Sequence, residues 1–196
     1  MAAEALIFDL DGTIWDSASW FARGLEETVA ASPQDVRDRL VGSGNIIAEI
    51  NRAGISRSKL LNSAFAVAGP PPLFDGIGEA LDELKVRRVP LAVATNLPGT
   101  LVTPMLEMTG LNAHFSSVVH AGVCRTPKPH PRSILLTLGE LGISPSLDVV
   151  YIGDRNSDAE AAARAGVSMA WVTHGYEPVS VRAGVRAISA QEISDL

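Results

Sequence analysis

The sequence predicts an α/β protein, a doubly wound parallel sheet with a small all-helical domain inserted after the first strand. Short apolar runs alternate with amphipathic helices from residue 76 onward, which is typical of a parallel sheet covered on both faces. Residues 16–69, in contrast, show helical periodicity only. Polar residues follow the apolar runs directly, at the edge where sheets of this class bind ligands.

The first predicted strand is the apolar run that begins at Ala5 and leads into Asp9 and Asp11. Apolar residues then recur at helical spacing until three consecutive prolines, which we interpret as part of a linker at 68–76. We therefore expect an α/β core made of residues 1–15 and 70–196 and a helical domain at 16–69. The residues that set the helical spacing are Trp20, Phe21, Leu25 and Val29, then Ile46, Ile47 and Ile50, then Leu60, Leu61, Ala64 and Phe65.

The alternation in the core gives its remaining elements in order. Gly110, Gly142 and Gly166 end three of the predicted helices, because glycine readily takes the positive φ with which chains leave a helix. The apolar runs between the helices are continuous, as in strands that are buried on both faces. The predicted helices are 76–87, 100–109, 131–142 and 157–166, and the predicted strands are 89–96, 115–121, 148–154 and, as the last, 167–173.

The composition bounds the possible functions. With 196 residues, 46% of them hydrophobic and 19% charged, the chain can bury a sizeable core. Sixteen basic and 22 acidic residues give a net charge of −6 without a dense Lys/Arg run, which argues against nucleic acid or a membrane surface as partner. The single Cys124 fits a reducing compartment. Since we find no signal peptide and no run near the roughly 18 apolar residues of a membrane span, we expect a cytoplasmic monomer or homodimer.

Chemically active side chains follow four of the predicted strands. A single aspartate at a strand end is usually a turn residue or a helix cap. Four coincidences at one edge of a parallel sheet are much less frequent, and they favour a functional site. The residues are Asp9 and Asp11 after the first strand, Thr95 and Asn96 after the second, Lys128 in the loop after the third, and Asp154 after the fourth, with Asp158 one helical turn further.

The aspartates predict a metal site. Asp9 and Asp11 are two residues apart, so on a strand they would share a face and approach one point. Two like charges that close together raise one pKa or require a cation between them, and Asp154 can supply a third oxygen. A few carboxylates with room for water and a phosphate are typical of Mg²⁺. Zn²⁺ is disfavoured because none of the four histidines adjoins these aspartates in sequence.

The remaining residues predict a phosphoryl group as the ligand. Lys128 supplies a positive charge, and Thr95 supplies a hydroxyl and an N–H. A carboxylate can attack phosphorus to form an aspartyl-phosphate, while the second carboxylate gives and later takes a proton, help that is typically worth about 10² to 10⁴ in rate. Gly12 lets the chain turn so that backbone N–H groups face an anion. A small phosphorylated metabolite is the expected partner.

Four short segments, in this order, resemble the haloacid dehalogenase-like (HAD) hydrolases, in particular their phosphoglycolate phosphatase-like branch. They are FDLDGT, VATN, TPKPHP with Lys128, and GDRNSD; DGIGEALDEL after the prolines is also similar to that branch. One such motif would be weak support, whereas four in family order with compatible strand placement are specific. The resemblance covers nearly the whole chain and implies the Rossmann-like core of that family.

By this resemblance Asp9 is the nucleophile and Asp11 the general acid and base. Haloacid-cleaving members work without a metal and lack the second aspartate, so Asp11 favours phosphate chemistry. The resemblance thus implies an Mg²⁺-dependent phosphatase that acts on phosphate monoesters of small metabolites through a phosphoaspartate. The other implied roles are phosphate binding for Thr95, Asn96 and Lys128, Mg²⁺ binding for Asp154 together with Asp9 and the Asp11 carbonyl, and support for Asp158, near the metal or beside Lys128.

Similar proteins carry a helical cap between the first and second motifs, and residues 16–69 occupy that position. The cap is short for the family. In such proteins cap residues complete the pocket and exclude water during the first step. The basic residues of this segment that could reach an anionic substrate tail are Arg23, Arg37, Arg39, Arg52, Arg57 and Lys59.

Other functions stay open at this point. A sugar phosphomutase of the same fold is one, although related mutases use a cap histidine and all four histidines lie outside 16–69. A phosphonate-cleaving relative would need a cap lysine, for which Lys59 is the only candidate. A signalling receiver domain is disfavoured because no strand-ending aspartate occurs between residues 17 and 94. A catalytically silent protein that keeps the fold for binding is the last alternative.

Overall fold

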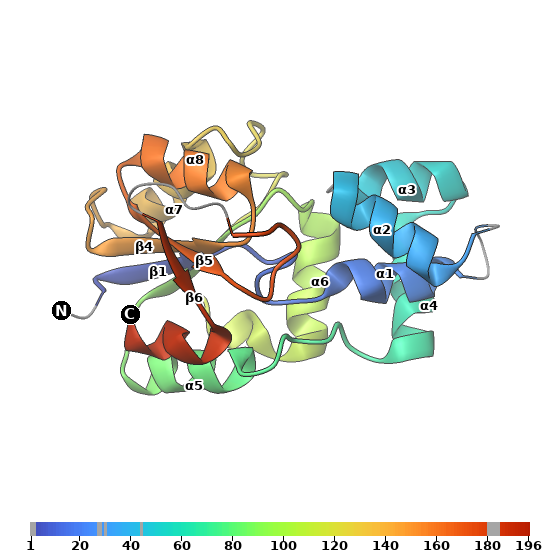
Figure 1. Ribbon diagram of the computed structural model, residues 1–196, viewed down its shortest axis with the longest axis horizontal. Coiled ribbons are helices and arrows are strands. Elements are labelled where there is room, and N and C mark those ends of the chain that lie inside the picture. Colours follow the sequence, from blue (N-terminus) through green and yellow to red (C-terminus); the bar gives the residue numbers. More distant parts are fainter. Residues whose placement is uncertain (1–2, 27–28, 30, 44, 180–184) are drawn as a thin grey trace.

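The protein, in its computed structural model, is a parallel sheet with helices on both faces (Figure 1). The structure describes residues 3–26, 29, 31–43, 45–179 and 185–196. In these residues six strands follow the order β3-β2-β1-β4-β5-β6, so the chain winds from β1 to one edge and from β4 to the other, which confirms the doubly wound prediction. The strands are β1 (Ala5–Phe8), β2 (Leu91–Ala94), β3 (Ser117–Val119), β4 (Val149–Gly153), β5 (Ser168–Val172) and β6 (Val185–Ile188).

The central strand has apolar side chains on both faces, because alternate residues of a strand point to opposite sides. Ile7 belongs to the apolar cluster that includes residues of α7 and α8, whereas Leu6 and Phe8 belong to the cluster on the other side with α5 and α6. Figure 1 shows α7 and α8 above the sheet and α5 below it. The helices are α5 (Ile77–Val86), α6 (Gly99–Thr109), α7 (Arg132–Leu141) and α8 (Asn156–Ala165).

In the described residues between β1 and α5, four helices gather beside one end of the sheet (Figure 1). Polar side chains accept the free N–H groups at their starts: Asp16 caps the first, Asn45 the third and Ser56 the fourth. No strand occurs in the described residues of 16–69, as predicted, and none of the described helices has the length and apolarity needed to cross a membrane. The four are α1 (Ser17–Leu25), α2 (Pro33–Ser43), α3 (Ile46–Ala53) and α4 (Arg57–Ala68).

Two stretches of chain join these helices to the sheet, and they pair with each other. Trp15, just before α1, forms an antiparallel bridge with Leu73, which follows α4. Asp16 N–H donates to the Pro72 carbonyl at 3.1 Å. Trp15 is fully buried, so this two-stranded connection is part of the core. The connection fixes where α1 begins relative to the end of β1.

The strand predicted at 167–173 is present as β5, but the prediction that it is the last strand is wrong. β6 follows β5 and pairs with it in parallel, with Met169 opposite Val185 and Val172 opposite Ile188. β6 is an edge strand in which Arg186 and the residue after it are exposed. It therefore lacks the continuous apolar run by which the inner strands are recognised.

Candidate active site

The carboxyl edge of the sheet brings the predicted residues around one space. Asp9 follows β1, and its N–H still donates to the β4 carbonyl of Ile152 at 2.8 Å. Thr95 follows β2 in the same way, donating to the β3 carbonyl of Val119 at 2.9 Å. Asp154 follows β4 and is fully buried. Because the strands are parallel and in register, these positions are set by the backbone ladder itself.

Lys128 is the centre of a buried charge cluster. Its Nζ lies 2.9 Å from Asp9 Oδ1 and 2.7 Å from Asp158 Oδ1, and it donates to the Tyr151 hydroxyl at 2.7 Å. That hydroxyl donates in turn to the Ala94 carbonyl at 2.7 Å. Burial alone would lower the pKa of Lys128, but Asp158 and Asp9 outweigh it and hold that pKa above its ordinary value. Lys128 is therefore a fixed positive charge beside Asp9.

Asp158 orients Lys128 and the turn after β4. Its Oδ2 accepts from the N–H groups of Asp154 at 3.2 Å and Arg155 at 3.0 Å, while Oδ1 faces Lys128. Burial raises the pKa of Asp158, and Lys128 acts against that rise. Gly153 allows the close approach, since a Cβ there would lie 2.6 Å from Asp158 Oδ2. Of the two supporting roles predicted for Asp158, these contacts favour the one beside Lys128.

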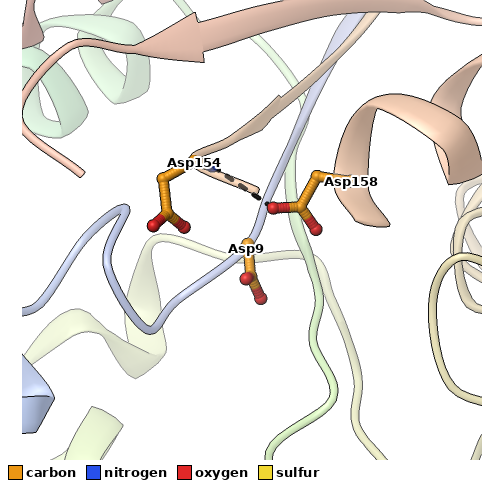
Figure 2. A group of neighbouring side chains, drawn as sticks. All are labelled: Asp9, Asp154 and Asp158. Carbon is orange, nitrogen blue, oxygen red and sulfur yellow. Dashed lines mark hydrogen bonds between the residues drawn. The ribbon is translucent and has the colours of Figure 1, made fainter. Parts of the chain in front are cut away.

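Three carboxylates, those of Asp9, Asp154 and Asp158, offer oxygens that all lie within 4.8 Å of one another. Figure 2 shows them side by side, coming from the end of β1, the end of β4 and α8. Burial, together with the charges of Asp158 and Asp9, raises the pKa of Asp154 to about 8. Buried carboxylates this close require a proton or a cation. Oxygen-only donors in small number fit Mg²⁺, and these three carboxylates could hold such an ion.

Tyr176 and Thr13 hold the Asp154 carboxylate in place by hydrogen bonds. Oδ2 accepts from Tyr176 N–H at 2.8 Å, and Oδ1 accepts from the Thr13 hydroxyl at 3.3 Å. Gly12, with φ +83°, lies against it, and a Cβ there would be 2.4 Å from Oδ2. The Gly12 N–H donates to the Trp15 carbonyl at 3.0 Å. Gly12 therefore lies against Asp154. It is not among the described residues that line the cavity, although phosphate binding was predicted for it.

Asp11 lies at the cavity beyond the turn, outside the group of three carboxylates. The expectation that it shares a strand face with Asp9 is wrong, because β1 ends at Phe8. Its Oδ1 accepts from the Ser17 hydroxyl at the start of α1. Burial raises the pKa of Asp11 to about 6, against the opposite effects of Ser17 and Arg155. A carboxyl that titrates near neutrality can both give and take a proton.

Thr95 and Asn96 form the wall on the β2 side. The Thr95 hydroxyl accepts from Leu97 N–H at 3.2 Å, and the Thr95 residue is 3% exposed. Asn96 pairs with both backbone groups of Lys128: Oδ1 accepts from its N–H at 2.9 Å, and Nδ2 donates to its carbonyl at 3.4 Å. Asn96 therefore holds the lysine loop in addition to lining the cavity.

A cavity of ≈ 320 Å³ lies between these residues and the helical segment, a volume suited to a small ligand. The six basic residues predicted to reach a substrate from 16–69 are all absent from its described lining. Arg155 and Glu177, which the sequence analysis did not single out, do line it. The helical segment contributes the end of α2 and the start of α3, through Gly42, Ser43, Asn45, Ile46 and Ile47.

Sequence reasoning had a signal for one of the two missed residues. Arg155 directly follows Asp154 in the fourth motif, so its neighbourhood was predictable. Glu177 lies beyond β5 and reaches the site only because that loop folds back, so that Glu177 Oε2 accepts from Asn156 N–H at 2.9 Å. No pattern in the sequence marks that contact.

Known proteins resemble this chain over most of its length. The family model described as haloacid dehalogenase-like hydrolase matches residues 3–166. A phosphoglycolate phosphatase of Pectobacterium atrosepticum is 31% identical over 193 residues, covering 89% of this chain and 82% of the relative. One from Photorhabdus laumondii is 30% identical over 190 residues, covering 88% and 81%. The crystal structure of a HAD-superfamily hydrolase from Geobacter sulfurreducens, 26% identical, has a TM-score of 0.70 and covers 98% of this chain and 96% of that one. The chain therefore belongs to the haloacid dehalogenase-like hydrolases, as one of their phosphatases.

Proposed function

We propose that the protein hydrolyses phosphate monoesters of small metabolites, with Mg²⁺ and through a phosphoaspartate on Asp9. The observation that carries the proposal is the setting of Asp9. Its carboxylate lines the cavity, 2.9 Å from Lys128 Nζ and close to the Asp154 carboxylate. A carboxylate between a fixed cation and a metal site can approach the phosphorus of a bound phosphate.

In the first step an Asp9 oxygen bonds to phosphorus, and the bond between phosphorus and the ester oxygen breaks. Asp11 in its protonated form gives its proton to that oxygen, so the alcohol leaves neutral. A pKa of about 6 keeps part of Asp11 protonated near neutral pH. The end of α2 and the start of α3 line the cavity on the side of the helical segment, and we expect them to limit the access of bulk water at this stage.

In the second step a water molecule attacks the phosphorus of the phosphoaspartate. The Asp11 carboxylate, now without its proton, takes one from that water, and the Asp9 carboxylate is released together with inorganic phosphate. The chain returns to its starting protonation state. One carboxyl thus serves as acid and then as base.

The other residues stabilise charge on the phosphoryl oxygens. Lys128 supplies a positive charge that its neighbours hold in place, and Thr95, whose N–H is taken by the Val119 carbonyl, supplies its hydroxyl as a donor from the β2 side. Mg²⁺, held by Asp9 and Asp154 with the predicted Asp11 carbonyl, would supply further positive charge to the phosphate. We also propose that 16–69 acts as a cap domain on the core of 1–15 and 70–196, in a cytoplasmic monomer or homodimer.

Phosphate release from an aryl phosphate is the first test. We expect turnover with Mg²⁺, a loss of at least about 100-fold with chelator, and recovery when Mg²⁺ is restored. Activity that survives chelation would contradict the metal role, and failure with every ester in a panel would favour the catalytically silent alternative. With sugar phosphates, an isomerised product without free phosphate would favour the phosphomutase instead.

Thermal unfolding should reveal the crowded carboxylates. Asp154 has a pKa of about 8 in the folded chain and an ordinary value of 3.8, so the metal-free protein loses this carboxyl's stabilising protonation as the pH rises between those values. We expect Mg²⁺ to raise Tm more at pH 8 than at pH 5.5, because the ion replaces the lost proton. Asp154→Asn should remove most of that difference. Equal Mg²⁺-induced shifts at both pH values would contradict this explanation.

A further inference from the structure

Arg155 is, with Lys128, one of two basic side chains on the described wall of the cavity. Lys128 is already paired with the carboxylates of Asp9 and Asp158. The basic residues of the helical segment lie elsewhere, as described above. An anionic group of a substrate beyond its phosphate would therefore meet Arg155, which comes from the core rather than from the helices.

The backbone and side chain of Arg155 are both held in place. Its N–H donates to Asp158 Oδ2 at 3.0 Å, and its carbonyl accepts from Asp158 N–H at 3.0 Å, at the start of α8. The guanidinium carbon lies 5.5 Å from the centre of the Tyr176 ring, which is a favourable cation–π position. The side chain is 15% exposed. Its charge is thus positioned before any ligand arrives.

The guanidinium contacts the helical segment and still has donors to offer. Nη2 donates to the Val41 carbonyl at 3.2 Å, and Nη1 donates to Glu177 Oε1 at 3.4 Å. Val41 lies in the last turn of α2, where carbonyl groups have no partner within the helix. A guanidinium carries five N–H donors. In the described residues it makes these two hydrogen bonds, so further N–H donors remain for a ligand.

Glu177 reduces the charge of Arg155 only in part. Its Oε2 accepts from the N–H and the side-chain amide of Asn156, each at 2.9 Å, so the start of α8 holds this carboxylate. Its contact with Arg155 is the longest of the three, at 3.4 Å, and its side chain is 32% exposed. Such a partly exposed pair contributes little energy and can yield to a better acceptor.

We propose that Arg155 is a specificity-determining residue of this cavity. It binds an anionic group, a carboxylate or a second phosphate, that the substrate carries beyond the phosphate to be removed, while its Nη2 stays on α2. The inference rests on the proposed phosphatase function and narrows it to a class of substrate. The expected consequence is a preference for small phosphate esters that carry a second anionic group over esters of the same length whose other end is uncharged.

Matched two-carbon esters test the proposal. The measurement is kcat/KM for 2-phosphoglycolate and for the bisphosphate of ethylene glycol, each divided by the value for 2-hydroxyethyl phosphate. Arg155→Met should lower one or both ratios by about 10- to 100-fold, since it removes a charge-assisted hydrogen bond, and the ratio that falls identifies the anion. Glu177→Gln should raise that ratio, because it removes the competing charge and keeps an acceptor for Asn156. Arg57→Met is the control, since Arg57 contacts Thr100 outside the cavity lining.

An equal decrease in kcat/KM for all three esters in Arg155→Met would overturn the proposal. Such a result would mean that Arg155 only stabilises the contact between the core and α2. Unchanged ratios would also overturn it. Calorimetry of 2-phosphoglycolate and the bisphosphate with Asp9→Asn, and with Asp9→Asn combined with Arg155→Met, needs no turnover. There we expect at least a 10-fold weaker Kd for the preferred ester in the double variant. If the wild-type protein hydrolyses no ester, the proposed function fails, and this binding result still decides the role of Arg155.

Discussion

Asp9→Asn is expected to abolish phosphate release, by at least about 10⁴-fold in kcat, because the amide cannot form the covalent bond to phosphorus. Asparagine keeps the size of the side chain and an oxygen that can face Lys128, which lies 2.9 Å from Asp9 Oδ1. The fold should therefore persist. Release of inorganic phosphate at saturating Mg²⁺ measures the loss of activity, and circular dichroism with thermal unfolding measures whether the fold persists.

The control for this substitution is Asp148→Asn, which changes an exposed aspartate just before β4 in the same way. Its rate should equal that of the wild-type protein. Mass spectrometry of the Asp9→Asn sample must exclude deamidation back to aspartate, which would restore a trace of activity. A deamidation-free variant that retains more than a few per cent of the wild-type rate would rule out Asp9 as the nucleophile.

Lys128→Met is expected to reduce stability as well as activity. Lys128 is 5% exposed and is the cation between Asp9 and Asp158, so its removal leaves two buried carboxylates without a counter-charge. Breaking a buried pair in this way typically costs about 3–5 kcal/mol in the free energy of unfolding. Phosphate binding should weaken as well, because the fixed positive charge is lost. Urea unfolding in chelator at pH 8 and phosphate release in Mg²⁺ measure the two effects.

The pH dependence separates this explanation from a simple packing defect. At pH 5.5 the orphaned carboxylates can take up protons, so the loss of stability should be smaller than at pH 8. The double variant with Asp158→Asn should recover part of the loss. Lys85→Met, at an exposed position of α5, is the matched control and should change neither property. A small, pH-independent loss in Lys128→Met would argue against a buried charge cluster.

The sheet edge was predictable because parallel strands of continuous apolar residues place their carboxyl ends together. That rule alone located Asp9, Thr95 and Asp154, and the loop after β3 supplied Lys128. It did not locate the turn after Phe8, which separates Asp11 from the three clustered carboxylates. Strand ends depend on one or two hydrogen bonds, and the sequence does not specify them.

The contacts that the sequence could not provide come from loops that fold back over long separations. Tyr176 reaches Asp154, and Glu177 reaches Asn156, from beyond β5. The basic residues of 16–69 were candidates for the substrate pocket because helical periodicity does not say which face of a helix looks toward the site. β6 was missed because an edge strand need not be apolar on both faces.

The bridge between Trp15 and Leu73 has a topological consequence. Antiparallel bridge partners lie at the distance that a tight turn can span. The described helices between Trp15 and Leu73 therefore take the place of a hairpin loop: the chain leaves the core at Trp15 and returns to it at the neighbouring Leu73. Because the entropic cost of closing a loop grows slowly with its length, the helical segment 16–69 could be lengthened, shortened or exchanged while every strand of the sheet keeps its register.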